Sequence, residues 1–461
     1  MTEAGGGAKS DAEHERPPGV IHPTVVAELR SFALWARPLA VVVVVMGLLG
    51  VMYMAPAVDP GKHLHQFPIV VVNADTGALQ PGTDQKQYLG QQLLEGLQAG
   101  VDEQYPGKFD LDVVDRSTAL TRLDNAHAYG AIFIPANFSS ASFAFLGSAI
   151  GDTKVDQPVI EVFTNPGVGA VATQIATQFF TRSMAQVNQQ FGERLTAALV
   201  QQTDAAGIKV TGAGLTAITE PINVQESAAN PLPDNAGSGL TAFYYALLLV
   251  LAGFTGTMII SALIDGRLGF APVELGPMYE LRKRVPISRL GTLVVKWWAI
   301  FWVSLIVSGL FVLTSSLVGM YAPNKMALWM FGVLVITGVG IIANAILSIF
   351  GSAGLLINLI FFVVLGLPTS GGTVPLEAVP GFFRGLAVGE PLHQAFIGAR
   401  SILYFEANID AGLGTAIGMF LVFTVIGLIF GPIACVIYDR KGLIRRPDEA
   451  TESTGSHAAA V

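Results

Sequence analysis

Apolar stretches divide the chain into one N-terminal span, a polar block of 180 residues and an apolar second half. The first stretch runs from Pro38 to about Val58 without a charged residue, which is long enough to cross a hydrocarbon core of ~30 Å. Five further apolar stretches lie after the block, at 239–264, 290–320, 326–350, 352–368 and 412–438. The pattern predicts an all-α membrane bundle of six transmembrane helices with a domain inserted between the first and second.

The polar block, residues 59–238, alternates between two periodicities. Apolar runs or strict alternation predict strands at 67–73, 109–114, 129–135 and 159–163. Helical periodicity appears at 85–98, 117–127 and 169–202, with Ser117 as a candidate N-cap. Strands alternating with helices predict a small α/β domain with a partly parallel sheet. The stretch 208–238, which contains three prolines, is expected to return the chain to the membrane.

The two ends of the chain differ from this pattern. Residues 1–19 and 441–461 are small and polar, and we expect both to be disordered cytoplasmic tails. Between 20 and 37, apolar residues recur at helical spacing, which fits an amphipathic helix on the inner membrane face or simply the cytoplasmic end of the first span. The sequence thus predicts three parts between the tails. Residues 20–58 contain the amphipathic helix and the first transmembrane helix, residues 59–238 form the inserted α/β domain, and residues 239–440 form the rest of the transmembrane bundle.

Charge sets the expected orientation in the membrane. Only 13% of the residues are charged, against about 25% in soluble domains. Basic residues gather in the connection after the second span and in the tail after residue 439, and by the positive-inside rule both are cytoplasmic. Arg30 and Arg37 place the N-terminus there too. We therefore expect a multi-pass plasma-membrane protein with both termini cytoplasmic and an even number of crossings.

The block between the first two spans is then extracytoplasmic. It holds nine basic and eighteen acidic residues, so it is expected to attract neither nucleic acid nor anionic lipid. The single cysteine, Cys435, lies in the last span, which leaves this domain without disulfides. Ala55-Pro56-Ala57 has the form of a signal-peptidase site, but the long preceding region favours an uncleaved anchor.

Several segments also resemble a known family. FPIVVVNADTG (67–77), AHAYGAIFIPANFS (126–139) and NPLPDNAGSGLTAFYYALLL (230–249) resemble the YhgE/Pip (phage infection protein) family and the related nitrosoguanidine-resistance membrane proteins. Both look like relatives of type-2 ABC exporter permeases. The outer segment 367–400 is similar to the Gly- and Pro-rich re-entrant region that those permeases place before their last helix. The resemblance implies an exporter architecture that works as a homodimer.

The sequence limits which energy sources could drive transport. The chain has no P-loop, and its spans carry charges only at their ends, as at Asp265 and Lys296, where Lys296 is expected to snorkel to the membrane edge. Transport would then need a separate ATPase on the cytoplasmic loop 265–289. The candidate coupling residues of this loop are Glu274, Glu280, Arg282, Lys283 and Arg284. The same charges also fit an ordinary positive-inside loop.

The outer segment is the second candidate site. Glycines and prolines that break helices lie there among apolar residues, and irregular backbone at membrane depth is tolerated only where it is buried in protein or lines a cavity. The candidate outer-gate residues are Gly371, Gly372, Pro375, Pro380, Arg384 and Pro391, with Glu390 nearby. A purely structural cap fits the same composition.

No catalytic constellation, cofactor motif or metal site emerges, and His63 and His65 lack a third ligand. We expect a permease that exports hydrophobic or amphipathic compounds, such as lipids or drugs, with a separate ATPase. The alternative is a non-transporting envelope protein, either a surface receptor such as a phage receptor or a secretion-system scaffold, whose external domain binds a protein partner. Gly414 and Gly418 fit helix packing within one chain better than a dimer seam.

Overall fold

The computed structural model describes residues 32–81, 84–148, 156–206 and 219–443. Both predicted tails, apart from residues 441–443, lie outside these residues, and so does the predicted amphipathic stretch up to residue 31. The chain divides into two compact units, Met1–Val51 and Met52–Val461. In the first unit the described residues form most of helix α2 (Phe32–Val58), while the sheet and all other helices belong to the second.

A five-stranded mixed sheet forms the centre of the α/β region, which we define as residues 59–236. Its order is β4-β1-β5-β6-β7, with strands β1 (Phe67–Asn73), β4 (Phe109–Val113), β5 (Gly130–Ile134), β6 (Val159–Thr164) and β7 (Asn223–Ala228). Strand β1 is parallel to β4 and β5, β6 is antiparallel to β5, and β7 is parallel to β6. The predicted partly parallel sheet is confirmed, whereas β7 was missed because five of its six residues are exposed.

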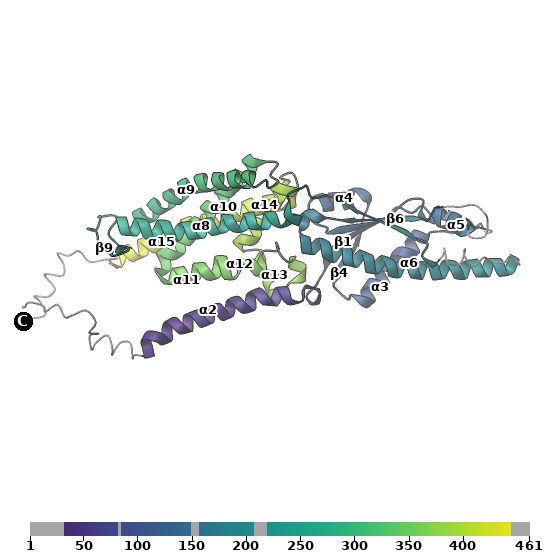
Figure 1. Cartoon of the computed structure of the whole chain (residues 1–461), viewed down its shortest axis with the longest axis horizontal. Coiled ribbons are helices and arrows are strands. Elements are labelled where there is room, and N and C mark those ends of the chain that lie inside the picture. Colours follow the sequence, from purple (N-terminus) through teal and green to yellow (C-terminus); the bar gives the residue numbers. More distant parts are fainter. Residues whose placement is uncertain (1–31, 82–83, 149–155, 207–218, 444–461) are drawn as a thin grey trace, which may run out of the picture. The chain divides into compact units, whose positions relative to one another are not determined.

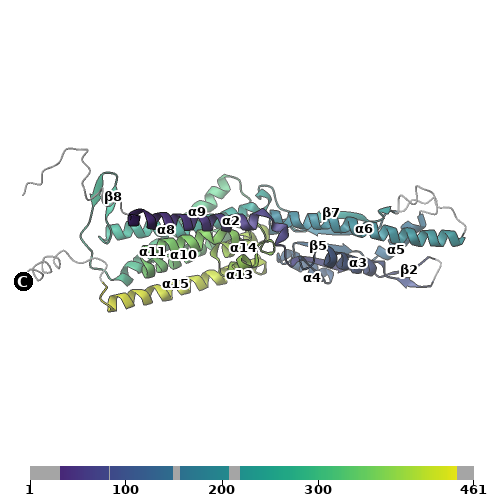
Figure 2. The ribbon, with the colours of Figure 1, turned by 90° about the horizontal axis from the view of Figure 1, so that it is seen from below.

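Helices cover both faces of this sheet. One face packs against α3 (Leu89–Gln104), α5 (Phe138–Ser148) and α6 (Ala170–Ala206), and the other against α4 (Arg116–Asp124). Helix α6 runs along β7, where the amide of Asn188 exchanges two hydrogen bonds with the backbone of Ile222 (Figure 2). Alternate residues of the central strands therefore enter two separate apolar cores.

Two predicted helix starts were wrong for local reasons. Helix α3 begins at Leu89 rather than at residue 85, because β3 (Lys86–Gln87) pairs with β2 (Ala78–Leu79). Helix α4 begins at Arg116, and its N-cap is Asp115 rather than Ser117, since the Asp115 carboxylate accepts from the backbone N–H of Thr118 at 3.0 Å.

Long apolar helices form the second half of the chain (Figure 1). They are α8 (Leu240–Arg267), α9 (Arg289–Leu317), α10 (Lys325–Phe350) and α15 (Gly414–Arg440). With the span Pro38–Pro56 of α2, five helices among the described residues are long and apolar enough to cross a membrane. The predicted span 352–368 is a shorter apolar helix, Ala353–Thr369, which consists of α11 (Ala353–Leu359), a π-turn at Ile360–Val364 and α12 (Gly366–Thr369).

Glycines bring the helices of this bundle close together. A side chain at Gly340 would lie 2.3 Å from Ile300 of α9, and one at Gly253 would lie 2.7 Å from Val339. Gly338 faces Phe420 of the same chain, whereas Gly418 has open space around it. Small residues thus serve packing within this chain at three of these positions.

The connections define two ends of the bundle. Between α8 and α9 the chain forms a hairpin of β8 (Val273–Leu275) and β9 (Met278–Glu280), and we call this the hairpin end. At the opposite end, here the domain end, the chain forms a short 3-10 turn at Leu376–Ala378, α13 (Gly381–Ala387), α14 (Pro391–Tyr404) and a second π-turn at Ile409–Leu413. From here on, the name outer segment covers residues 367–413, which are the predicted segment 367–400 and the chain up to the end of the second π-turn.

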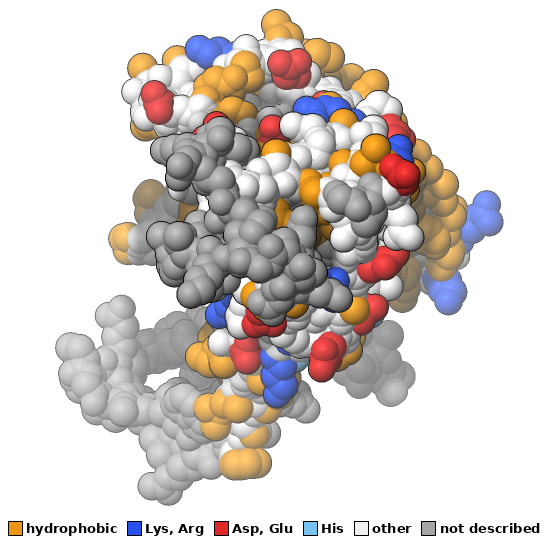
Figure 3. Space-filling model, turned by 90° about the vertical axis from the view of Figure 1, so that its right-hand side faces the viewer, with side chains coloured by type: hydrophobic (Ala, Val, Ile, Leu, Met, Phe, Trp, Pro, Cys, Tyr) orange, Lys and Arg blue, Asp and Glu red, His pale blue; other side chains and the backbone are white. Residues whose placement is uncertain are grey.

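The surface of the α/β region carries mixed charge. Figure 3 views the molecule from the right-hand side of Figure 1, and over the described part of this face acidic side chains are scattered among basic and apolar ones. Some of these acids have local roles, such as Asp112, whose carboxylate pairs with Arg122 at 2.5 Å. The excess of acidic residues is therefore spread over this face rather than gathered in one patch.

Candidate functional site

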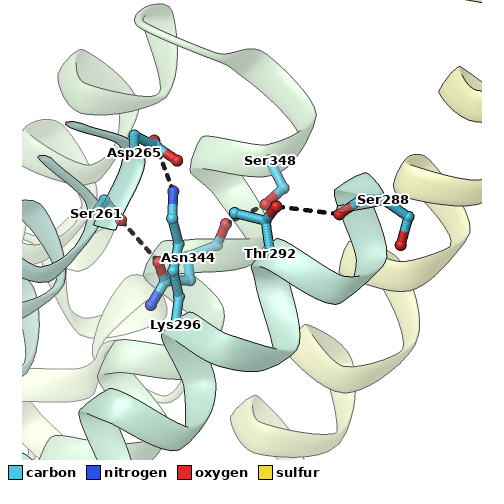
Figure 4. A network of polar contacts seen from close by, with 7 residues as sticks. All are labelled: Ser261, Asp265, Ser288, Thr292, Lys296, Asn344 and Ser348. Atoms are coloured by element: carbon cyan, nitrogen blue, oxygen red, sulfur yellow. Dashed lines mark hydrogen bonds and ion pairs between the residues drawn. The ribbon is translucent and has the colours of Figure 1, made fainter. Parts of the chain in front are cut away.

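A buried ion pair lies between α8 and α9 at the hairpin end of the bundle. The ammonium nitrogen of Lys296 lies 2.8 Å from a carboxylate oxygen of Asp265 (Figure 4). Lys296 is 7% exposed, and the Asp265 side chain is 19% exposed. Lys296 thus lies within two turns of the start of α9, and its charge is met there by the carboxylate of Asp265 near the end of α8.

Uncharged polar groups surround this pair. The hydroxyl of Ser261 donates to the amide oxygen of Asn344 at 2.9 Å, which joins α8 to α10, and Asn344 donates to the Gly340 carbonyl at 3.0 Å. Thr292 and Ser348 each bond a backbone carbonyl one turn earlier, at Ser288 and Asn344. In a segment as apolar as α10, such satisfied polar side chains hold neighbouring helices in one register.

A cavity of about 330 Å³ opens beside this network. Its lining includes Thr292, Lys296, Ser348 and Tyr438, whose hydroxyl donates to the Ile349 carbonyl at 2.7 Å. Cys435 also borders it. The hairpin end is therefore polar and hollowed where the spans meet the loop.

The predicted coupling residues lie on the hairpin and on the irregular stretch after it, and residues 268–288 contain no helix. Arg282 pairs with Glu280 at 2.9 Å, and the guanidinium of Arg284 lies 5.9 Å from the centre of the Phe270 ring. Glu274 and Lys283 are exposed. The five predicted residues thus share one surface loop but do not converge on a single point.

Polar contacts anchor this loop to the bundle at both ends. At its start, the Asp265 carbonyl accepts from the N–H of Phe270 at 2.8 Å. At its end, the Arg289 guanidinium donates to the Leu443 carbonyl at 2.6 Å and lies 3.6 Å from the Asp439 carboxylate at the end of α15. The loop is therefore fixed to α8, to α9 and to the end of α15.

Between these anchors the loop exposes apolar side chains. Met278 is 67% exposed and Tyr279 63%, and both belong to β9. Leu281 and Val285 are also exposed. Apolar groups that lie in a row among charged residues are typical of a surface that binds another protein.

The predicted outer-gate residues occupy turns and helix starts of the outer segment. Gly372 approaches α8 closely, since a side chain there would lie 2.4 Å from Phe243, whereas Gly371 adopts a φ of +71°, which favours glycine. Three further positions begin helices: Pro375 precedes the 3-10 turn, Pro380 precedes α13 and Pro391 opens α14. Arg384 lies in α13. These prolines act at helix starts, where a missing N–H costs little.

Glu390 is the most unusual group of the outer segment, and the sequence analysis gave it no role of its own. Its carboxylate caps α14 by accepting from the N–H of His393 at 2.8 Å, and the residue is 2% exposed. Burial raises the pKa of Glu390 to about 7 and lowers the pKa of His393, whose ring nitrogen contacts the Ser370 carbonyl at 2.9 Å, to about 4. An acidic residue directly before a proline is the signal that predicts such a cap.

A second cluster joins the outer segment to the α/β region. The hydroxyl of Tyr129 donates to the Glu377 carboxylate at 3.0 Å, and burial raises the pKa of Glu377. Asn408 donates to Asn125 at 2.7 Å. Because 248 residues separate Tyr129 from Glu377, no local sequence signal could reveal this contact.

Apolar packing strengthens the same junction. The Phe405 ring lies against Gly167, where a side chain would approach it to 2.8 Å. Phe405, Ala378 and Ala411 belong to the core that also contains the residues of one face of the sheet. Movement of the outer segment is therefore tied to the α/β region through both polar and apolar contacts.

Comparison with known proteins identifies the family. Residues 38–429 match the family described as protein of unknown function (DUF3533). Because this match covers well over half of the sequence, the chain belongs to that family. No curated protein matches it.

Proposed function

We propose that the protein is a plasma-membrane permease that exports hydrophobic or amphipathic compounds and works as a homodimer with an ATPase on a separate chain. The observation that carries this proposal is the anchored loop at the hairpin end. It exposes Met278 and Tyr279 between two charged anchors, Asp265 and Arg289, that connect it to three helices. A protein that bound this loop and changed shape would act directly on the packing of the spans.

The topology belongs to the same proposal. The segment 353–369 follows Ile349, which contacts Tyr438 at the hairpin end, and precedes Gly372, which contacts Phe243 near the domain end. The chain therefore runs from the hairpin end to the domain end over the segment 353–369, and this supports a sixth membrane crossing by the short helix. The positive-inside rule then puts the hairpin end in the cytoplasm, with both termini, and the α/β region outside as an inserted domain.

The resemblance to YhgE/Pip proteins and type-2 ABC permeases is part of the proposal. The outer segment supports it, because a broken helix packed among spans and tied to an external region is suited to open and close a path. In this reading Gly372 allows the close packing of the closed state, and the junction of Tyr129 with Glu377 transmits movement to the α/β region.

Copurification and export test this proposal together. The full-length protein, isolated in mild detergent, should retain an ATPase subunit and should export a lipophilic dye from cells. Met278→Ser and Tyr279→Ser should each weaken ATPase retention and dye export, because they remove exposed apolar surface from the loop. Leu79→Ser is the matched control, since Leu79 is 62% exposed on the α/β region against 67% for Met278.

The alternative function makes the opposite prediction. If no ATPase is retained and the Met278 and Tyr279 variants export as the wild type does, the permease proposal fails. A non-transporting envelope protein, acting as a receptor or as a secretion-system scaffold, would then be the better description. Capture of a protein partner by the α/β side of the full-length chain would support it.

A further inference from the structure

A cavity of about 420 Å³ lies at the part of the α/β region that follows the first span along the chain. Three cationic side chains from separate elements line it: Lys62 of the 3-10 turn after α2, Lys108 before β4 and Arg182 of α6. The region holds twice as many acidic as basic residues, so three of its nine cations meet at one hollow.

The cations of this cavity outnumber its carboxylates. Asp59 is the acidic residue of the lining, and its carboxylate accepts from the backbone N–H of Lys62 at 3.1 Å and caps the turn, so three cations line the cavity together with one anion. The Lys108 ammonium donates to the Gly61 carbonyl, which carries no net charge. Within the part of the chain that the structure describes, the side-chain charges of Lys62 and Arg182 have no ion-pair partner.

Apart from Gly61 and the polar Gln178, the rest of the lining is apolar or aromatic. The rings of Phe109 and Phe179 lie with their centres 4.2 Å apart and border the cavity. A ligand that fits must therefore combine a compact anionic group with an apolar portion. Arginine and lysine together suit a phosphoryl group, which offers several acceptor oxygens and more than one direction of approach.

The place of the cavity along the chain indicates where such a ligand comes from. The first span ends at Pro56, and Lys62 follows six residues later, which limits their separation to about 20 Å. If α2 crosses the membrane, this cavity lies close to the lipid headgroups, where anionic groups are available to basic side chains.

We propose that this cavity binds the phosphoryl group of an anionic amphiphile, with Lys62, Lys108 and Arg182 as its cationic ligands. This refines the expectation from net charge that the block avoids anionic lipid, because a local concentration of cations outweighs the average charge of the region. Lipid binding at this cavity does not require transport. The lipid-binding proposal can therefore fail while the permease proposal stands, and the permease proposal can fail while lipid binding stands.

Binding of short-chain lipids to the purified full-length protein tests the proposal. In nonionic detergent and without ATP, the wild type should bind dihexanoyl phosphatidylglycerol at least tenfold more tightly than dihexanoyl phosphatidylcholine, measured by isothermal titration. Affinity should fall as salt is raised, because the attraction is partly electrostatic. Equal binding of the two lipids would overturn the proposal without any variant.

Matched double variants locate the site. Lys62→Gln with Arg182→Gln should weaken phosphatidylglycerol binding roughly tenfold, which corresponds to about 1.4 kcal/mol. Lys86→Gln with Arg194→Gln removes the same charge from the same region, and Arg194 lies on α6 with Arg182, yet neither residue lines the cavity. Binding weakened to the same degree by both doubles would show a diffuse charge effect and refute the site.

Inorganic phosphate distinguishes a lipid from a soluble ligand. Millimolar phosphate should compete with phosphatidylglycerol for the wild type, which would show that the phosphoryl group is the recognised part. Phosphate alone should bind far more weakly than the lipid, because it leaves the aromatic surface of Phe109 and Phe179 uncovered. If phosphate binds as tightly as the lipid, the ligand is a soluble anion and the amphiphile is ruled out.

Discussion

The Lys296 ammonium contacts the Asp265 carboxylate at the residue from which the hairpin loop departs. The side chain of Asp265 faces α9, while its backbone carbonyl accepts a hydrogen bond from the N–H of Phe270 at the start of the loop. One residue thus belongs both to the packing of two spans and to the start of the surface that we propose an ATPase contacts. The ion pair therefore connects the loop to the interior of the bundle.

Breaking this pair should lower stability. Lys296→Met removes the closest cation from a largely buried carboxylate, and we expect the free energy of unfolding to fall by roughly 2 kcal/mol or more. Asp265→Asn should have a similar effect, and the double variant should cost clearly less than the sum of both. Denaturant titration of the four proteins in detergent measures this coupling.

The exposed pair of Arg282 with Glu280 is the control for this cycle. Its side chains are 35% and 58% exposed, so solvent screens the attraction. Arg282→Met with Glu280→Gln should show a coupling below about 1 kcal/mol. Effects at Lys296 and Asp265 that add within ~0.5 kcal/mol would argue that the buried pair does not act as a unit.

Two glycines of the outer segment should respond differently to the same substitution. Gly372→Ala places a methyl group 2.4 Å from the Phe243 ring, and we expect a loss of about 1–3 kcal/mol as the segment shifts. Gly381→Ala meets open space at the start of α13 and should be neutral or slightly stabilising. Thermal unfolding compares the two, and equal midpoints would contradict the close packing at Gly372.

The buried groups of the outer segment predict opposing pH effects. Burial raises the pKa of Glu390 from 4.5 to about 7 and lowers the pKa of His393 from 6.5 to about 4. Between pH 4.5 and 6.5 the folded protein therefore holds one more proton than the unfolded chain at Glu390 and one fewer at His393. In the wild type these two contributions to the free energy of unfolding largely cancel.

Single variants should separate the two contributions. Glu390→Gln removes the contribution of Glu390, so the stability of this variant relative to wild type should rise with pH between about 4.5 and 7, by at most ~1.4 kcal/mol per pH unit. In His393→Gln only Glu390 remains, so stability should be greatest below pH 4.5 and fall as the pH approaches 7. Denaturant midpoints of both variants across this pH range measure the two contributions. Parallel pH profiles would show that Glu390 and His393 are not the source of opposing pH effects.

Cysteine labelling in intact cells tests the proposed orientation. Ser227→Cys and Ser238→Cys, both at exposed positions, should react with an impermeant thiol reagent. Glu274→Cys on the hairpin should react only after permeabilisation. The wild type is the blank, because its single cysteine, Cys435, is buried. The reverse pattern would overturn the orientation inferred from the basic loop.

Local patterns were sufficient for most elements of this fold. The β-branched runs at 67–73 and 129–135 became the buried strands β1 and β5, because uninterrupted apolar sequence is typical of strands covered on both faces. Five of the six predicted spans were equally visible from length and composition. Strand β7 was missed because NVQESA has no apolar alternation, and only its pairing with β6 makes it a strand.

The candidate sites were less visible because their residues meet across long sequence separations. The position of Gly372 followed from composition, but its partner Phe243 of α8 did not. The sequence placed Lys296 near the end of its span but did not reveal Asp265 as its partner, since a sequence shows where a charge lies along a helix and not what faces it. The meeting of Lys62, Lys108 and Arg182 likewise depends on how three elements fold together.

The shared core of the α/β region has a consequence for how the protein is made. Ala378, Phe405 and Ala411 complete that core, yet the ribosome produces them more than 140 residues after Ala236, the last residue of the region. A nascent chain that ends before residue 411 holds a sheet whose apolar edge is still uncovered. Final folding of the N-terminal half must therefore wait until the chain up to residue 411 has been synthesised, and premature termination before that point exposes this surface to proteases or chaperones.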